Sequence, residues 1–292
     1  MAPAPIPAPR GSGFTRSTGV PLYWCSYGPP GAPRLLVLHG GPGADHAYLL
    51  PQLLELTPEF ELVFYDQRGG GQSKEAVPTH ITWETQVEDL ARVIAEFRLN
   101  PLSLVGYSWG GLLALLYARS AAADPDRLMP ARLALIDPAP VSRRYRDRFE
   151  AEFARRQQGP AIQAMRAGLA ASGLKERDPA AYRQRAFEIS VAGYFADPNR
   201  ATDLTPFRVT GRVQQSIWES LGDFDLEADL RAVRCPALVV HGRQDPIPLE
   251  SSESIAKSLG AEFVPLDDCG HVPYVEQPVK LFSALKGFLQ AR

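Results

Sequence analysis

The chain has 292 residues, of which 45% are hydrophobic and 22% charged, and its 31 basic side chains nearly balance 33 acidic ones to leave a net charge of −2. A balance this even argues against a nucleic-acid partner, which requires a strongly basic surface, and the longest apolar stretch, Leu112 to Ala118, is too short to cross a bilayer. Three scattered cysteines without a CxxC pair exclude a disulfide framework and favour a reducing compartment, so the cytoplasm is the predicted location.

The chain begins with a Pro/Ala-rich stretch that lacks both the basic and the apolar region of a secretory signal, and we expect residues 1–12 to form a disordered tail. Apolar residues at helical spacing then predict a helix over Thr82 to Leu99, and a nearly all-apolar run predicts another over Gly110 to Ser120. Short apolar runs bounded by turn residues predict buried strands at Arg34 to Leu38, Glu61 to Tyr65, Leu102 to Val105 and Arg132 to Ile136.

The end of the chain repeats this alternation of strands and helices. The predicted strands are Ala237 to Val240 and Glu262 to Leu266, and the predicted helices are Ser251 to Leu259 and Val279 to Gln290. Buried strands joined by helices imply a parallel sheet that is covered on both faces. Residues 141–224 instead contain Arg-rich helical segments and no convincing strand. We therefore expect a core of residues 13–140 and 225–292 that carries a helical insertion at 141–224.

The segment Gly106-Tyr107-Ser108-Trp109-Gly110 matches G-x-S-x-G, the pattern of a nucleophile elbow. The chain must turn sharply there from a strand into a helix, and the glycines on either side of Ser108 let the backbones approach each other. A predicted strand precedes the motif and an apolar helix follows it, which is the context that the motif requires. Ser108 is therefore the candidate nucleophile, and a Gly-rich turn with an incidental serine is the alternative.

A serine nucleophile needs a histidine base, and the base needs a carboxylate to orient it. Three of the five histidines precede Ser108, and His241 ends a strand before any well-placed acid. His271 follows the last predicted strand, at the edge of the sheet where ligands bind, and is the candidate base. Asp245 follows the preceding strand and is the first choice for the acid, the alternative being that it only caps the turn before Pro246.

A glycine-rich loop, His39-Gly40-Gly41-Pro42-Gly43, follows the first predicted strand. Consecutive glycines allow an N–H group to point at a developing oxyanion, so the backbones of Gly41 and Trp109 are the candidate oxyanion donors. The loop has neither of the common nucleotide-binding patterns, and the chain has no HExxH or paired His/Cys spacing. We therefore expect no cofactor and no metal.

Together these motifs resemble the α/β-hydrolase fold and, within it, the proline iminopeptidase (prolyl aminopeptidase) branch. The resemblance covers residues 20–140 and 225–292 and rests on HGGPG, DQRG with GQS after it, the elbow with Trp109-Gly110-Gly111, GRQDP and CGH. It implies a catalytic triad of Ser108, Asp245 and His271. It also implies a mostly parallel sheet with helices on both faces and a helical cap inserted after the sixth strand.

The cap region departs from the peptidase pattern. The resemblance implies glutamates that bind a free amino terminus, but Pro206 and Pro246 stand at their places. Glu188 and Glu219 are the candidate substitutes for binding the substrate. The Arg-rich segment 143–156 also contains Asp and Glu residues, which favours a solvated helix face with i,i+4 ion pairs over an anion site.

These residues predict a cofactor-independent serine hydrolase that cleaves a small-molecule or short-peptide amide or ester through an acyl-enzyme. A carboxylesterase or lactonase without aminopeptidase activity is the alternative, and a non-catalytic protein that binds a small ligand is a third possibility. Neither a nucleic acid nor a membrane is a predicted partner, and the sequence leaves the oligomeric state open.

Overall fold

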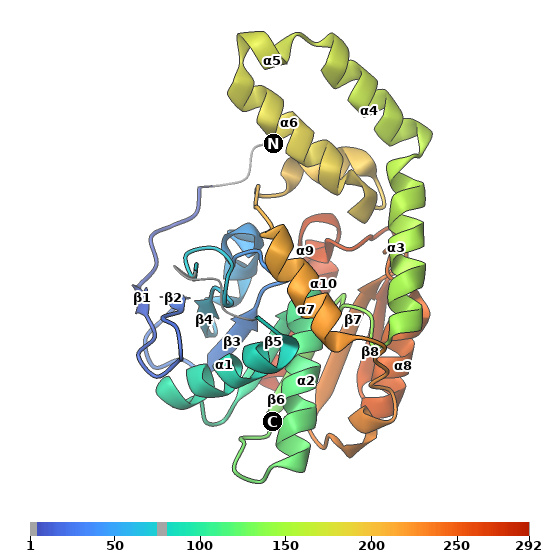
Figure 1. The fold of residues 1–292 in the computed structure, drawn as a ribbon. Helices are drawn as coiled ribbons and strands as arrows, with labels where there is room; N and C mark the ends of the chain where they lie inside the picture. The colour runs from blue at the N-terminus through green and yellow to red at the C-terminus, as the bar shows by residue number, and fades with distance from the viewer. Residues whose placement is uncertain (1–4, 75–80, 292) are drawn as a thin grey trace.

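The computed structural model describes residues 5–74 and 81–291, so the first four residues of the expected tail lie outside it (Figure 1). The described residues form an eight-stranded sheet in the order β1-β2-β4-β3-β5-β6-β7-β8. Every pairing from β4 to β8 is parallel, and the two edge pairings, β1 with β2 and β2 with β4, are antiparallel. The strands are β1 (Gly11–Phe14), β2 (Tyr23–Tyr27), β3 (Arg34–Leu38), β4 (Glu61–Tyr65), β5 (Ser103–Tyr107), β6 (Arg132–Ile136), β7 (Ala237–Gly242) and β8 (Glu262–Leu266).

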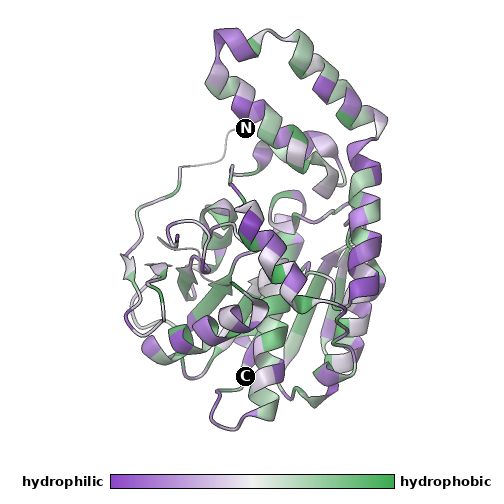
Figure 2. Cartoon of the chain, in the orientation of Figure 1, coloured by the Kyte–Doolittle hydropathy of each residue, from purple (hydrophilic) through white to green (hydrophobic). Residues whose placement is uncertain are grey.

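Helices cover both faces of the sheet, because successive residues of a buried strand point to opposite sides. In β3, Leu36 and Leu38 belong to one apolar cluster with helices α1 (Trp83–Glu96), α2 (Trp109–Ala123) and α8 (Leu249–Leu259). Leu35 and Val37 of the same strand belong to the other cluster, with α9 (Pro273–Glu276) and α10 (Pro278–Gln290). Figure 2 shows the hydrophobic strands at the centre, with mixed hydrophilic and hydrophobic helices around them. The predicted α/β-hydrolase fold is confirmed.

The segment between β6 and β7 is helical. Its elements are α3 (Arg143–Gln157), α4 (Pro160–Ala171), α5 (Leu174–Arg177), α6 (Pro179–Val191), the short 3-10 helices Ala192–Tyr194 and Pro198–Asp203, α7 (Gly211–Leu221) and the 3-10 helix Asp229–Ala232. Figure 1 shows α4, α5 and α6 standing away from the sheet. By contrast, α7 packs on the core through Val213 and Ile217. Two further 3-10 helices, Ala47–Leu49 and Gln52–Leu56, lie between β3 and β4.

The antiparallel edge was not predicted, and it shortens the expected tail. Gly11 and Ser12 fall within the predicted tail, but they belong to β1 and pair with Ser26 and Cys25 of β2. β1 alternates between half-buried and exposed residues, so it lacks the continuous apolar run that marks a central strand. None of the helices in the described part of the chain is both long and apolar enough to span a membrane.

Candidate active site

Ser108 lies at a sharp turn between β5 and α2. Its backbone has φ 52° and ψ −119°, a conformation that costs a residue with a side chain about 1–3 kcal/mol. The flanking glycines are required sterically: a Cβ on Gly106 would lie 2.5 Å from the carbonyl oxygen of Gly110, and a Cβ on Gly110 would lie 2.1 Å from that of Leu38. The tight packing of α2 against β3 and β5 thus lifts Ser108 to the end of the sheet.

The structure brings Ser108, His271 and Asp245 into one line. His271 Nε2 lies 3.0 Å from Ser108 Oγ, and His271 Nδ1 lies 2.7 Å from Asp245 Oδ2. The backbone of His271 is held at both ends, because its N–H donates to the Tyr194 carbonyl at 2.7 Å and its carbonyl accepts from the Tyr107 hydroxyl at 2.8 Å. This arrangement fits a nucleophile, a base and an orienting acid.

Burial sets the electrostatics of this line. It lowers the pKa of His271 to about 4, although the nearby carboxyl groups of Asp137 and Glu276 act to raise it, so the imidazole is neutral near pH 7 and able to accept a proton. Burial also raises the pKa of Asp245, whereas the neighbouring Asp137 side chain and the hydrogen bond from the Ile247 N–H lower it. The ionised form of Asp245 therefore depends on the donors that face it.

The two candidate oxyanion donors belong to the residue that follows Ser108 and to the glycine-rich loop after β3. Trp109 is the first residue of α2, where N–H groups have no acceptor within the helix. Gly41 has a φ of 125°, which favours glycine, and it lines the same cavity as Ser108. Neither N–H group donates to another residue in the described ranges, 5–74 and 81–291. Both are therefore available to an oxyanion.

Gln67 links the glycine-rich loop to the elbow, a role that the sequence did not reveal. Its backbone N–H donates to His39 Nε2 at 3.0 Å, and its side-chain Nε2 donates to the His39 carbonyl at 2.8 Å. Its Oε1 accepts from Trp109 Nε1 at 2.8 Å. The signal was present in the DQRG motif, but only the fold shows which groups this fully buried amide joins.

Ser108 and His271 open onto a cavity of about 500 Å³ between the sheet and the helical segment. Its other lining residues are Gly41, Ala139, Pro140, Arg146, Phe149, Glu150, Phe153, Ala154, Tyr194, Gly211, Gln214, Gln215, Trp218 and Ile247. The volume suits a small molecule or a short peptide end.

The lining does not include Glu188 or Glu219, the predicted substrate-binding glutamates. Glu188 is buried on α6, where it accepts from Arg185 at 2.8 Å and from Gln184 at 3.0 Å. Glu219 is exposed on α7 and accepts from Gln215. Neither glutamate lines the cavity that Ser108 and His271 share, and a role for either in binding a substrate stays a prediction.

The carboxylate that does line this cavity is Glu150 of α3. It forms the predicted i,i+4 ion pair with Arg146 at 2.7 Å, and the guanidinium of Arg146 stacks on Trp218 at 4.2 Å from the ring centre. The prediction of i,i+4 ion pairs along the Arg-rich helix is therefore confirmed. The Arg146–Glu150 pair, however, also lines the cavity. The aromatic residues at i,i+4 spacing beside it, Phe149 and Phe153, were the available signal.

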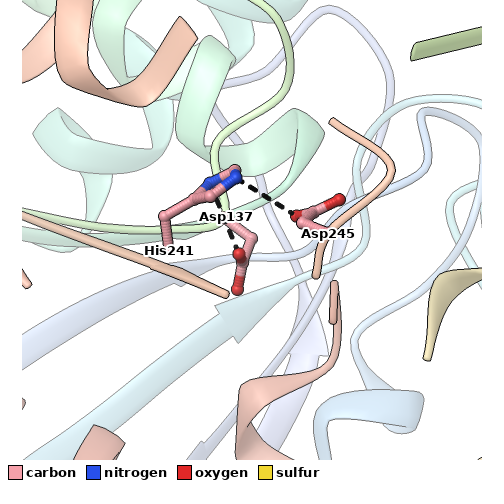
Figure 3. Close-up of side chains that lie close together, drawn as sticks. All are labelled: Asp137, His241 and Asp245. Atoms are coloured by element: carbon pink, nitrogen blue, oxygen red, sulfur yellow. Dashed lines mark ion pairs between the residues drawn. The ribbon is translucent and has the colours of Figure 1, made fainter. Parts of the chain in front are cut away.

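Behind the line of Ser108, His271 and Asp245 lies a buried cluster of Asp137, His241 and Asp245 (Figure 3). His241 Nδ1 is 3.4 Å from Asp137 Oδ1, and His241 Nε2 is 3.9 Å from Asp245 Oδ2. One potential ligand atom from each residue lies within 4.8 Å of the others. However, both nitrogens of His241 already have partners, Ser252 Oγ at 2.9 Å and the Ile247 carbonyl at 3.2 Å. The cluster is therefore a hydrogen-bonded part of the interior.

Comparisons with known proteins show the family and the fold to which the chain is similar. The family model described as the alpha/beta hydrolase family matches residues 35–285. A proline iminopeptidase of Saccharolobus solfataricus is 24% identical over 301 residues, covering 95% of this chain and 91% of that protein. The solved structure of a proline iminopeptidase-related protein from Thermus thermophilus has a TM-score of 0.71 at 23% identity, covering 96% of each chain.

A second solved structure, the enol-lactonase from Burkholderia xenovorans, has a TM-score of 0.65 at 22% identity, covering 96% of this chain and 100% of that one. At such identities the solved structures show the fold alone. The resemblance to proline iminopeptidases is confirmed by the named relatives. With most of its length matched by the family model, the chain belongs to the alpha/beta hydrolase family.

Proposed function

We propose that this protein is a serine hydrolase that cleaves a small acyl substrate through an acyl-enzyme. The observation that carries the proposal is the line from Ser108 Oγ to His271 Nε2 at 3.0 Å and from His271 Nδ1 to Asp245 Oδ2 at 2.7 Å. A serine hydroxyl is a weak nucleophile, and a neutral imidazole held within hydrogen-bond distance activates it.

In the first half of the reaction, Ser108 Oγ attacks the acyl carbonyl and His271 Nε2 takes the hydroxyl proton. The carbonyl oxygen becomes negative, and the N–H groups of Gly41 and Trp109 stabilise it. His271 then gives its proton to the leaving group, which departs and leaves the acyl group on Ser108. In the second half, His271 takes a proton from water, the hydroxide attacks the ester, and Ser108 recovers its proton. Asp245 stabilises the imidazolium in both halves.

The cavity favours an ester or lactone over an N-terminal proline amide. Binding a free ammonium group calls for a carboxylate that is free to pair with it. Among the cavity-lining residues of the described ranges, Glu150 is the one carboxylate, and Arg146 already pairs with it at 2.7 Å. Phe149, Phe153 and Trp218 provide apolar walls that suit a neutral acyl chain.

Aminopeptidase activity is the second candidate. It is supported by the names of the relatives and by Glu150, whose side chain is 51% exposed and so able to exchange Arg146 for a substrate ammonium. In either case residues 141–224 act as a cap that limits entry to small substrates. The reaction as written needs no cofactor, and the cytoplasm stays the predicted location.

Three substrates compared side by side distinguish these candidates: p-nitrophenyl butyrate, proline-β-naphthylamide and N-acetylproline-β-naphthylamide. We expect turnover of the ester and none of either amide, and Ser108→Ala should abolish it. Cleavage confined to the free-amine substrate, lost in Glu150→Gln but kept in the matched control Glu219→Gln, would instead establish the aminopeptidase. Equal rates for wild type and Ser108→Ala on every substrate would overturn the serine mechanism.

A further inference from the structure

Asp137 is a buried carboxylic acid beside the proposed triad that the mechanism above does not use. It follows β6, and Asp245 follows β7, so the adjacent parallel strands place the two residues at the same edge of the sheet. Asp137 is 0% exposed and Asp245 7% exposed, and they share the cluster in Figure 3. Two buried carboxylates this close together repel each other strongly, and such pairs retain one proton.

The two carboxyl oxygens of Asp137 differ in their hydrogen bonding. Oδ1 accepts a hydrogen bond from the Gly242 N–H at 2.8 Å. Oδ2 is fully buried and accepts no hydrogen bond from any donor among the described residues. A carboxylate oxygen without a donor is costly in the interior, whereas a protonated oxygen can itself donate. Oδ2 is therefore the atom suited to carry the proton.

Asp137 also has a backbone conformation that residues other than glycine rarely adopt. Asp137 has a φ of 40°, in the left-handed region that favours glycine. Its N–H donates to the Val240 carbonyl of β7 at 2.9 Å, which fixes the residue beside the strand that leads to Asp245. A strained residue that also buries a carboxyl group needs a compensating role.

We propose that Asp137 is a positioning residue that keeps a proton in the resting protein and presents it to Asp245, so that the pair carries one negative charge and Asp245 holds it. This proposal rests on the proposed function, because the value of an ionised Asp245 lies in stabilising the His271 imidazolium. Burial and the nearby charge of Asp245 raise the pKa of Asp137 well above its ordinary value. Hydrogen bonding from Asp137 acts in the opposite direction on Asp245 and lowers its pKa.

The other titratable groups around the pair leave a second negative charge unfavourable. They are His241, Tyr107, Tyr194, Cys269, His271, Tyr274, Glu276 and Arg156. Within this set Arg156 is the one permanent cation, and Glu276 adds a further acid. His271 is neutral at rest, so its positive charge arises only when it takes the proton of Ser108. With one proton on Asp137, Asp245 stays ionised and can stabilise the imidazolium when it forms.

Isotope-edited infrared spectroscopy of protein labelled at its aspartate carboxyl carbons tests the location of this proton directly. We expect the carbonyl stretch of a protonated aspartic acid at pH 7, and we expect Asp137→Asn to remove it. The matched control is Asp267→Asn, which removes an aspartate whose side chain is 73% exposed and paired with Arg243, and should leave that band intact. Absence of the band in wild type, or its persistence in Asp137→Asn, would overturn the proposal.

The rate at which a fluorophosphonate labels Ser108, followed against pH, tests the positioning role. Asn can accept from Gly242 through its oxygen and donate to Asp245 through its NH₂ group, so Asp137→Asn should restore most of the rate. Asp137→Leu removes the donor to Asp245. We expect this variant to be labelled at least tenfold more slowly at pH 7, and we expect the apparent pKa of the acidic limb of its rate–pH profile to rise by about one unit or more. If the Asn and Leu variants had the same acidic limb in their rate–pH profiles, Asp137 would serve only in packing, and the proposal would be refuted.

The two measurements separate this proposal from the proposed function. If Ser108 is not a nucleophile, no variant is labelled, yet the infrared band still reports whether Asp137 is protonated. If Asp137→Leu does not fold, the Asn variant and the infrared spectra still decide the outcome.

Discussion

Gly110 is the position where a single methyl group should do most damage to the elbow. A Cβ there would lie 2.1 Å from the Leu38 carbonyl oxygen and 2.7 Å from that of His39, both backbone atoms that cannot rotate away. Relief requires the start of α2 and the end of β3 to separate by about 1 Å, since non-bonded heavy atoms need well over 3 Å between them. Overpacking of this kind costs about 1–3 kcal/mol, and the better helix propensity of Ala returns at most about 1 kcal/mol.

Activity should fall further than stability in Gly110→Ala. A displacement of about 1 Å at a catalytic group lowers the rate by about 10²-fold. The movement changes the 3.0 Å contact between Ser108 Oγ and His271 Nε2 and the aim of the Trp109 N–H together. We therefore expect Gly110→Ala to lose about 1–2 kcal/mol in the free energy of unfolding and about 10²-fold in the fluorophosphonate labelling rate.

Two other helix glycines provide matched controls. Gly168 in α4 and Gly287 in α10 are exposed, and a Cβ on either would meet no atom within 4 Å. Each Gly→Ala change there should raise the free energy of unfolding by about 0.5–1 kcal/mol, measured by urea denaturation, with an unchanged labelling rate. Wild-type stability and labelling in Gly110→Ala, or damage from Gly168→Ala equal to it, would refute the steric reasoning.

Three further changes test other parts of the account. Ser108→Gly should be inactive yet about 1 kcal/mol more stable to urea than Ser108→Ala, because only glycine is relaxed at φ 52°, and the reverse order would argue against strain at the elbow. Gln67→Leu leaves the buried Trp109 Nε1–H without its acceptor, so it should lower the free energy of unfolding by about 1–3 kcal/mol in the same assay and slow the labelling of Ser108. Wild-type stability and labelling would mean that Gln67 does not support the oxyanion loop. Burial opposes the charged form of His46, but its 2.6 Å hydrogen bond to Asp66 prevails and raises its pKa from 6.5 to about 10. The folded state therefore holds this proton more tightly than the unfolded state. Its stabilising effect is complete below pH 6.5 and is lost as the pH rises towards about 10, a decline that His46→Asn should flatten in urea titrations.

Most of the parallel strands could be predicted closely because a buried parallel strand needs an unbroken apolar run. β3, β4, β6 and β8 have the predicted bounds, whereas β5 and β7 each end two residues beyond the predicted Val105 and Val240. β1 has no such run, since GSGF lies half exposed at an edge where backbone hydrogen bonds to β2 hold it in place. Its existence depends on a partner strand that hydrophobicity does not reveal.

The candidate triad was predictable for a related reason, because Ser108, Asp245 and His271 each occupy a short motif at the end of a strand. The structure brings these three together. The cap region gave less information: whether Glu150 or Glu188 faces Ser108 depends on how the helices pack, and both sit in plausible helical patterns. Asp137 was not singled out either, because its meaning comes from the adjacency of β6 and β7 and not from any local motif.

The most direct test of the central claim is mass-spectrometric mapping of the protein after reaction with a fluorophosphonate. The account predicts a single adduct on Ser108 in the folded protein, at least about 10³-fold slower labelling in His271→Ala, and none at this site in Ser108→Ala. Its absence from the urea-unfolded protein would show that the folded geometry creates the reactivity. A folded protein that carries no adduct on Ser108, or labels it equally well without His271, would contradict the claim that this line of side chains is a catalytic triad.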